Sequence, residues 1–219
     1  MGRGAVRLLV CVCITLASVA TASAGPREER GRANLGAAEA AKSQPPEFGK
    51  SLATAARQQV SYFVFYNSSY QKIPYPMGDV PSYFGVCTDV VVRALRRAKS
   101  IDLQKLVHED MSAHFAAYPH QERWGQDEPD ANIDHRRVPN LMTYFSRAGY
   151  SLPITARSAD YLPGDLVAWN LGGGILHIGI VSDRHAVTRV PLVIHNIGAG
   201  TREEDILFRY TIIGHYRMP

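Results

Sequence analysis

The chain has 219 residues, of which 46% are hydrophobic and 20% are charged. This is the composition of an ordinary globular protein, so a largely disordered chain is excluded. The formal net charge is +4, and the length is sufficient for one domain to bury a core without disulfide bonds.

The first 24 residues have the features of a secretory signal peptide. Arg3 and Arg7 form a positive start, residues 8–20 are apolar, and small residues follow at Ala22-Ser23-Ala24. We therefore expect residues 1–24 to be removed by cleavage after Ala24. An uncleaved anchor is the weaker alternative, because a membrane span needs ~20 apolar residues. The expected location is the periplasm or the medium, with no membrane attachment after cleavage.

Cleavage changes both the charge and the cysteine content. The Lys+Arg count falls from 24 to 22 against 20 acidic residues, so the net charge falls from +4 to +2. This small surplus argues against a nucleic-acid partner. Cys11 and Cys13 are removed, which leaves Cys87 alone. A single cysteine is a buried apolar residue, an intermolecular bridge or a reactive thiol.

The remaining chain reads as a leader followed by one domain. Residues 25–50 are rich in Ala, Gly, Glu, Arg and Pro and predict a flexible leader, with the domain over residues 51–219. Apolar periodicity predicts helices over residues 51–60, 88–98, 101–118 and 139–148. Turn-bounded apolar runs predict strands over residues 166–169, 175–181, 192–196 and 211–217. Helices followed by an antiparallel sheet predict an α+β fold.

Cys87 immediately precedes the helix predicted over residues 88–98. A thiol at this position faces unpaired backbone N–H groups and the positive end of the helix dipole. Both stabilise the thiolate, which is the nucleophilic form. The position therefore favours a reactive cysteine, although a small buried structural residue is also common at a helix start.

Two histidines are candidate partners for this thiol. His177 opens the run His177-Ile178-Gly179-Ile180-Val181, and His195 ends the next predicted strand. If these strands are adjacent and antiparallel, the two rings lie side by side. One ring would then act as the base for Cys87, and the other would orient it.

Four separated segments are similar to the papain-like peptidoglycan peptidases of the NlpC type. They are Val86-Cys87-Thr88-Asp89-Val90, Pro163-Gly164-Asp165-Leu166-Val167, His177-Ile178-Gly179-Ile180 and the strand that ends at His195. Tyr75, upstream of the cysteine, matches a tyrosine near the oxyanion region of that family. Further segments, such as Gly214-His215-Tyr216-Arg217, resemble a bacterial family of unknown function, DUF1287, thought to belong to the same clan.

This resemblance implies a papain-like α+β fold and amide hydrolysis by a Cys87–His177–His195 triad. It implies that the Cys87 N–H and the Tyr75 hydroxyl stabilise the oxyanion, with Asn196 supporting His195. The chain departs from the family in the residues next to the cysteine and in an insertion over residues 101–140. These departures concern the substrate pocket.

Four charged residues are candidate substrate-binding groups: Asp79, Asp89, Arg136 and Arg137. The arginines could pair with a carboxylate of a stem peptide, and the alternative is a structural ion pair with Asp130 or Asp134. No HExxH or CxxC motif occurs, so we expect neither a metal site nor a cofactor.

The leading hypothesis is a secreted cysteine amidase or endopeptidase, expected to be monomeric, whose partner is a peptidoglycan peptide. An acyl-transfer, thioester or lipid hydrolase on the same fold is one alternative. A non-catalytic cell-wall-binding module is another.

Overall fold

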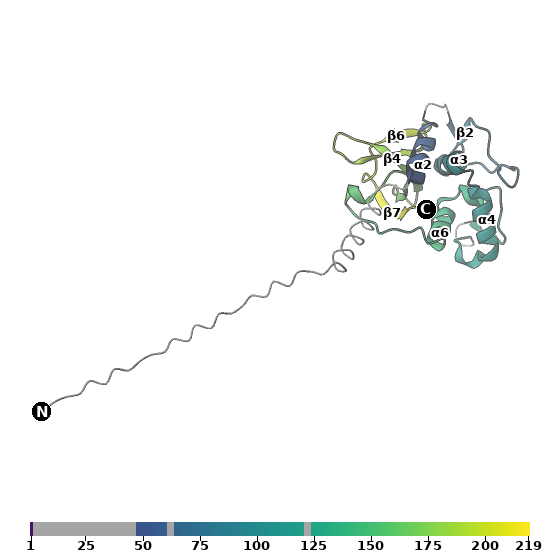
Figure 1. Ribbon diagram of the computed structural model, residues 1–219. Helices are drawn as coiled ribbons and strands as arrows, with labels where there is room; N and C mark the ends of the chain where they lie inside the picture. The colour runs from purple at the N-terminus through teal and green to yellow at the C-terminus, as the bar shows by residue number, and fades with distance from the viewer. Residues whose placement is uncertain (2–46, 61–63, 121–123) are drawn as a thin grey trace. The chain divides into compact units, whose positions relative to one another are not determined.

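The computed structural model describes Met1 and residues 47–60, 64–120 and 124–219. The predicted signal peptide and the predicted leader up to residue 46 lie outside the described residues, apart from Met1. All elements labelled in Figure 1 belong to the unit formed by residues 42–219.

Four α-helices lie wholly within the described residues: α2 (Glu47–Arg57), α3 (Cys87–Lys99), α4 (Leu103–Ala113) and α6 (Val138–Arg147). Short 3-10 helices are η1 (Phe115–Ala117), η2 (Asp134–Arg136) and η3 (Ser158–Asp160). The strands are β1 (Phe65–Tyr66), β2 (Phe84–Gly85), β3 (Leu166–Asn170), β4 (Leu176–His185), β5 (Pro191–His195), β6 (Arg202–Glu204) and β7 (Thr211–Tyr216). The predicted α+β class is confirmed.

The main sheet is antiparallel, with the strand order β6-β5-β4-β3-β7. Its central strand, β4, pairs Ile180 with Ile194 of β5 and His177 with Trp169 of β3. A separate parallel pair, β1 and β2, lies upstream of α3 in the chain and pairs Phe65 with Phe84. The strand that carries His177 is therefore directly beside the strand that carries His195.

The helices α2 and α3 pack on one face of this sheet, α6 contacts β4 and β7, and α4 packs against α3 and α6 (Figure 1). Ile178, Ile180 and Ile194 face the helices and join the main core. Side chains of a strand alternate between faces, so Trp169 and Val181 join a second, smaller apolar cluster.

The sequence of α3 explains why it is the central helix. Val91, Ala94 and Leu95 are fully buried, and burying a side chain such as Val or Leu typically contributes ~1.5–3 kcal/mol. The helix ends at Ser100, which has a φ of 54° in the left-handed region. Its first residue is Cys87, so the packing of α3 fixes where the thiol lies.

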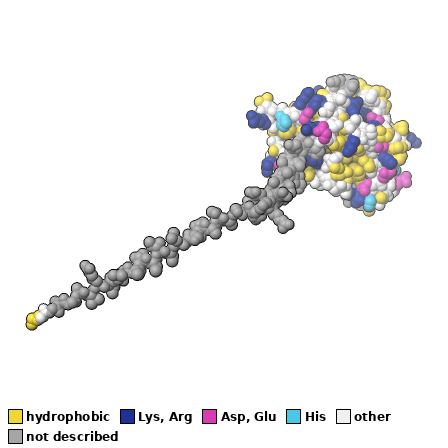
Figure 2. Space-filling model, viewed as in Figure 1, with side chains coloured by type: hydrophobic (Ala, Val, Ile, Leu, Met, Phe, Trp, Pro, Cys, Tyr) yellow, Lys and Arg dark blue, Asp and Glu magenta, His cyan; other side chains and the backbone are white. Residues whose placement is uncertain are grey.

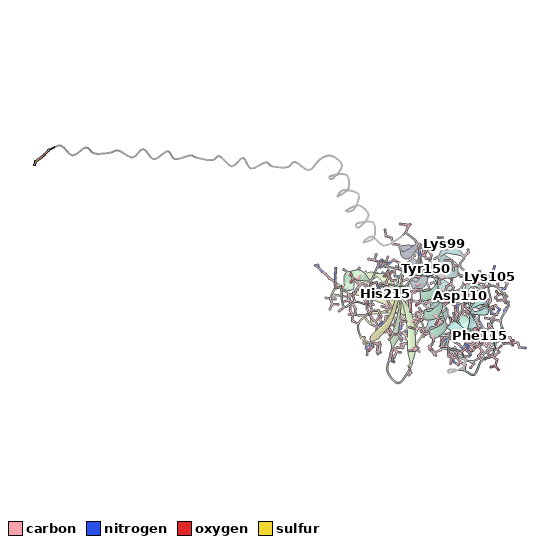
Figure 3. The ribbon with its side chains drawn as sticks, turned by 90° about the horizontal axis from the view of Figure 1, so that it is seen from below. Lys99, Lys105, Asp110, Phe115, Tyr150 and His215 are labelled. Carbon is pink, nitrogen blue, oxygen red and sulfur yellow. The ribbon has the colours of Figure 1, made fainter. Side chains whose placement is uncertain are left out.

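Polar contacts join α4 to α6. Asp110 of α4 accepts a hydrogen bond of 2.7 Å from Nε of Arg147, at the end of α6, and one of 2.6 Å from the hydroxyl of Tyr118. Asp110 is labelled in Figure 3.

On the face shown in Figure 2, Lys and Arg side chains are interspersed with Asp and Glu side chains. No helix within the described residues is both long and apolar enough to cross a bilayer.

Two predicted boundaries differ from the structure. The leader predicted over residues 25–50 is wrong at its end, because α2 begins at Glu47 and both Phe48 and Leu52 pack against the core. The helix predicted over residues 101–118 divides into α4 and η1, because His114 has non-helical backbone angles. The short strands β1, β2 and β6 were not predicted.

Candidate active site

Cys87 is 4% exposed and lies at the start of α3, beside the central strand of the sheet. The backbone N–H groups of Ile178 and Thr88 lie beside its sulfur and lower the pKa of the thiol. N–H groups alternate between the two sides of an antiparallel strand, and that of Val181 bonds to Asp165 on the β3 side. The Ile178 N–H therefore points toward β5.

The β4–β5 pairing does not extend past Ile180 and Ile194 toward Ile178. The Cys87 sulfur therefore lies at a hydrogen-bonding position that β5 leaves open, beside the backbone N–H of Ile178, the residue after His177. This placement explains how a residue at a helix start is brought to the end of a strand pair.

The protonation state of Cys87 differs from the sequence-based expectation. Burial raises the pKa of this thiol from 9.0 to about 11, and the nearby Asp89 carboxylate also raises it. The hydrogen bonds from the backbone N–H groups lower the pKa, but they do not offset the cost of burying a charge. With a pKa of about 11, Cys87 is a neutral thiol at pH 7, whereas its position at the helix start alone favoured the thiolate.

Tyr66 is the tyrosine beside the thiol. Its side chain shares a hydrogen bond with Cys87, and burial of the hydroxyl, followed by the proximity of Cys87, raises the pKa of Tyr66 to about 12. Tyr66 keeps 45% of its surface exposed, so the ring is at the surface while the hydroxyl faces inward.

Tyr75, the predicted oxyanion residue, lies elsewhere. Its ring contacts His108 of α4, with centroids 5.1 Å apart, and its charged neighbours include Glu109 and Lys105 on the same helix. The prediction for Tyr75 is therefore wrong in position. The loop after β1 carries Tyr75 toward α4 instead.

His177 and His195 form a hydrogen-bonded pair within the buried part of the site. Nε2 of His177 lies 3.0 Å from Nδ1 of His195, and Nε2 of His195 lies 3.0 Å from a carboxylate oxygen of Glu204 on β6. Both histidines are at most 2% exposed. The predicted side-by-side placement of the two rings is confirmed.

Glu204 determines the tautomer of both rings. A carboxylate only accepts, so His195 donates from Nε2 and its Nδ1 is left as an acceptor. His177 must then donate from Nε2, which leaves a lone pair on its Nδ1. Glu204 was not predicted, because it lies in a three-residue strand without a recognisable motif.

Both histidines are neutral in the resting site. Burial, with a smaller contribution from His195, lowers the pKa of His177 to about 3. Burial also lowers the pKa of His195, although Glu204 opposes the shift. Cys87 and His177 are not hydrogen-bonded to each other, and catalytic pairs often close only when substrate binds.

A small residue in β4 allows the two histidines to approach. A Cβ atom added to Gly179 would lie 2.7 Å from Cγ1 of Val193 and 3.1 Å from Cβ of His195. A larger residue at this position would push β5, and His195 with it, away from His177. The glycine in the His177-Ile178-Gly179-Ile180 run thus has a packing role.

Asn196 connects the histidine side of the site to the cysteine side. It is 1% exposed, and its Nδ2 donates to the carbonyl oxygen of Gly85, two residues before Cys87, at 3.4 Å. Its Oδ1 accepts from the N–H of Gly198 at 3.0 Å. These contacts hold the strand end that carries His195, and neither of them involves the His195 ring.

Asp89 and Arg136, two predicted substrate-binding residues, form a buried ion pair with each other. Nε and Nη2 of Arg136 donate to the two Asp89 oxygens, each at 2.9 Å. Asp89 also accepts from the N–H of Val86 at 2.7 Å, which closes the start of α3. Neither charge is available to a ligand, so the substrate-binding prediction is wrong for both residues.

Arg137 and Asp79 also have protein partners. Arg137 lies 3.3 Å from Asp134, as the alternative prediction held, and its guanidinium lies 4.0 Å from the centre of the Trp124 ring. Asp79 accepts two hydrogen bonds from Arg93, at 2.9 Å and 3.0 Å. None of the four predicted substrate-binding residues is brought to Cys87 as a free charge.

With this geometry described, the chain can be compared with known proteins. Residues 53–218 match the family described as "Domain of unknown function (DUF1287)". The chain belongs to this family. It is also 55% identical over 166 residues to "Uncharacterized protein YijF" of Escherichia coli (strain K12), which covers 76% of this chain and 80% of that protein. No solved structure matches the chain.

The chemistry open to this DUF1287 chain follows from its donor set. Among the residues that the structure describes, no group of three or more His, Cys, Asp or Glu side chains is placed to hold a metal ion. The site combines a thiol, an imidazole with a free lone pair and a tyrosine hydroxyl. These groups suit nucleophilic attack on a carbonyl with proton transfer to a base.

Proposed function

We propose that this protein is a secreted cysteine hydrolase that cleaves amide bonds in peptidoglycan stem peptides, on a papain-like fold of the NlpC clan. The supporting observations are the position of the Cys87 sulfur beside the N–H of Ile178, the residue after His177, and the hydrogen-bonded line from His177 through His195 to Glu204. The substrate class and the extracytoplasmic location rest on the sequence resemblance and on the signal-like residues 1–24.

In this proposal the resting pair is neutral and the proton moves during attack. Nδ1 of His177 takes the thiol proton as the Cys87 sulfur bonds to the amide carbonyl carbon. The imidazolium then donates that proton to the leaving amine, and the carbon–nitrogen bond breaks to leave a thioester. Water hydrolyses the thioester with His177 again as the base, which restores the thiol.

The environment of the two histidines supports this sequence of steps. The positive charge that develops on His177 is stabilised by its hydrogen bond to His195, whose other nitrogen faces the Glu204 carboxylate. The N–H groups at the start of α3 and the Tyr66 hydroxyl are the candidate donors to the oxyanion. Removal of one such donor typically slows acyl transfer ~100-fold or more.

Digestion of purified sacculi tests the proposal. Wild-type protein should release peptides that Cys87→Ala and His177→Ala do not release. His185→Ala is a matched control, because His185 is an exposed histidine at the far end of β4. Equal product from wild type and Cys87→Ala would refute the proposal and favour a non-catalytic wall-binding module.

An acyl or thioester hydrolase is the second candidate. Phe65 and Tyr83 are 55% and 54% exposed near Tyr66, and an apolar acyl chain could contact such rings. A thioester substrate incubated in parallel with the sacculi separates the two activities. Cleavage of the thioester alone would support this candidate over amide hydrolysis.

A further inference from the structure

A hollow of about 550 Å³ lies beside α3, on the side away from the main core. Its walls come from the loop before β2, from the exposed side of α3, and from residues near β1 and β6. The lining residues used here are Asp79, Ser82, Tyr83, Arg93, Arg96, Arg97 and Thr201.

The hollow has a surplus of positive charge. The hollow is lined by three arginines and by one carboxylate, that of Asp79. Arg93 donates a hydrogen bond to each of the two Asp79 oxygens. Arg96 is 3.9 Å from Asp79 and 3.8 Å from Asp102, and its buried Nε has no hydrogen-bond partner among the described residues.

Arg97 is the least neutralised of the three. Its only protein partner in the described part of the chain is the uncharged side-chain oxygen of Gln58, at 3.2 Å. A guanidinium offers several planar donors and pairs well with a carboxylate. Arg97 can therefore turn to an incoming anion without breaking an ion pair.

The other walls suit a peptide. Tyr83 is 54% exposed, and its ring forms an apolar side of the hollow. The hydroxyl groups of Ser82 and Thr201 face the same space, and neither has a hydrogen-bond partner within the described residues. These groups add uncharged donors and acceptors to the arginines.

The hollow lies within reach of the thiol. Arg97 follows Cys87 by ten positions, which is ~15 Å along α3 at ~1.5 Å per residue. An extended peptide advances ~3.3 Å per residue, so about four to five residues span this distance. A second hollow of about 420 Å³ shares Val64 and Thr201 with the first and is also lined by Glu204, the partner of His195.

We propose that the hollow beside α3 is a subsite that binds a carboxylate of the substrate peptide, with Arg97 as the main recognition group and Arg96 behind it. This inference rests on the proposed peptide substrate. It places the bound carboxylate about four to five residues from the amide that Cys87 attacks.

Calorimetric binding to the Cys87→Ala protein tests the subsite without turnover. The probes are a synthetic stem pentapeptide and analogues in which one carboxylate at a time is replaced by a carboxamide. We expect one analogue to bind about tenfold more weakly than the parent at low salt, since one charge-assisted pair is lost. Adding Arg97→Gln should weaken parent binding to the level of that analogue and remove the preference.

Two further variants separate recognition from general effects. Arg97→Lys keeps the charge and should retain part of the preference. Lys105→Gln removes an exposed positive charge from α4, outside the hollow, and should retain all of it (Figure 3). Thermal unfolding of each variant confirms that it is folded.

The subsite is refuted if Arg97→Gln keeps the preference, if all analogues bind as tightly as the parent, or if no peptide binds. Carboxylate-dependent binding through Arg97 without hydrolysis by the wild type would keep the subsite and refute the proposed amide cleavage. Hydrolysis at the wild-type rate in Arg97→Gln would keep the proposed amide cleavage and refute the subsite.

Discussion

The most informative perturbation is a change of pH at Cys87, because the structure requires a neutral thiol in the free protein. The pKa of about 11, against 9.0 for an unperturbed thiol, lowers the thiolate fraction at pH 7 about 100-fold. This shift corresponds to about 3 kcal/mol between the two protonation states, since one pKa unit is ~1.4 kcal/mol.

Alkylation by iodoacetamide reports this fraction, because only the thiolate reacts. Peptide mass spectrometry isolates the signal of Cys87 from that of any other cysteine. We expect the rate to rise about tenfold per pH unit from pH 6 toward 10, without a plateau, and to stay about 100-fold below the rate in the denatured chain at pH 7.

The sign of the linked stability change follows from the same shift. The unfolded thiol ionises first as the pH rises, so the free energy of unfolding should fall between pH 9 and about pH 11. A thiolate–imidazolium pair in the resting site would instead give a rate plateau between pH 5 and 8 that His177→Ala abolishes. That plateau would refute the neutral pair.

Three other predictions follow from the contacts of the site. Glu204→Ala should lower kcat about 10-fold to 100-fold, because the tautomers of the His177 and His195 rings are no longer fixed. Glu204→Gln should retain more activity, because its amide oxygen still accepts a hydrogen bond from His195. Wild-type activity in both variants would contradict this role of Glu204. Asp89→Ala should lower the free energy of unfolding, measured in urea, by about 3–5 kcal/mol, because it leaves the Arg136 charge buried without a partner. A loss below ~1 kcal/mol would show that the Asp89–Arg136 pair does not stabilise the fold. Tyr66→Phe should lower kcat about tenfold or more and Tyr75→Phe should not, and the opposite ranking would restore Tyr75 to the site.

The order of elements was predictable because local patterns determine it. The apolar spacing around Val91 and Leu95 predicted α3, and the alternation around His177 predicted β4. The proximity of His177 and His195 was also predictable, because in adjacent antiparallel strands the start of one strand lies beside the end of the other. These signals are short-range or depend on one simple topology rule.

The remainder of the site depends on long-range contacts. Tyr66 reaches Cys87 because the two-residue strands β1 and β2 pair, and such strands carry no periodic signal. Glu204 reaches His195 through the register of β6 on β5, which the sequence does not specify. The high pKa of Cys87 is set by burial, which outweighs the helix-start effect that position alone suggested.

The central claim is that Cys87 attacks an amide carbonyl of a cell-wall peptide and carries the acyl fragment. Acid quenching of a sacculus digest, followed by mass mapping of the peptide that contains Cys87, tests this claim most directly. We predict a peptide fragment attached to Cys87 in the wild type, removed by hydroxylamine, and no such adduct in His177→Ala. Amide cleavage with Cys87 unmodified at every time point, and undiminished in Cys87→Ala, would contradict the claim.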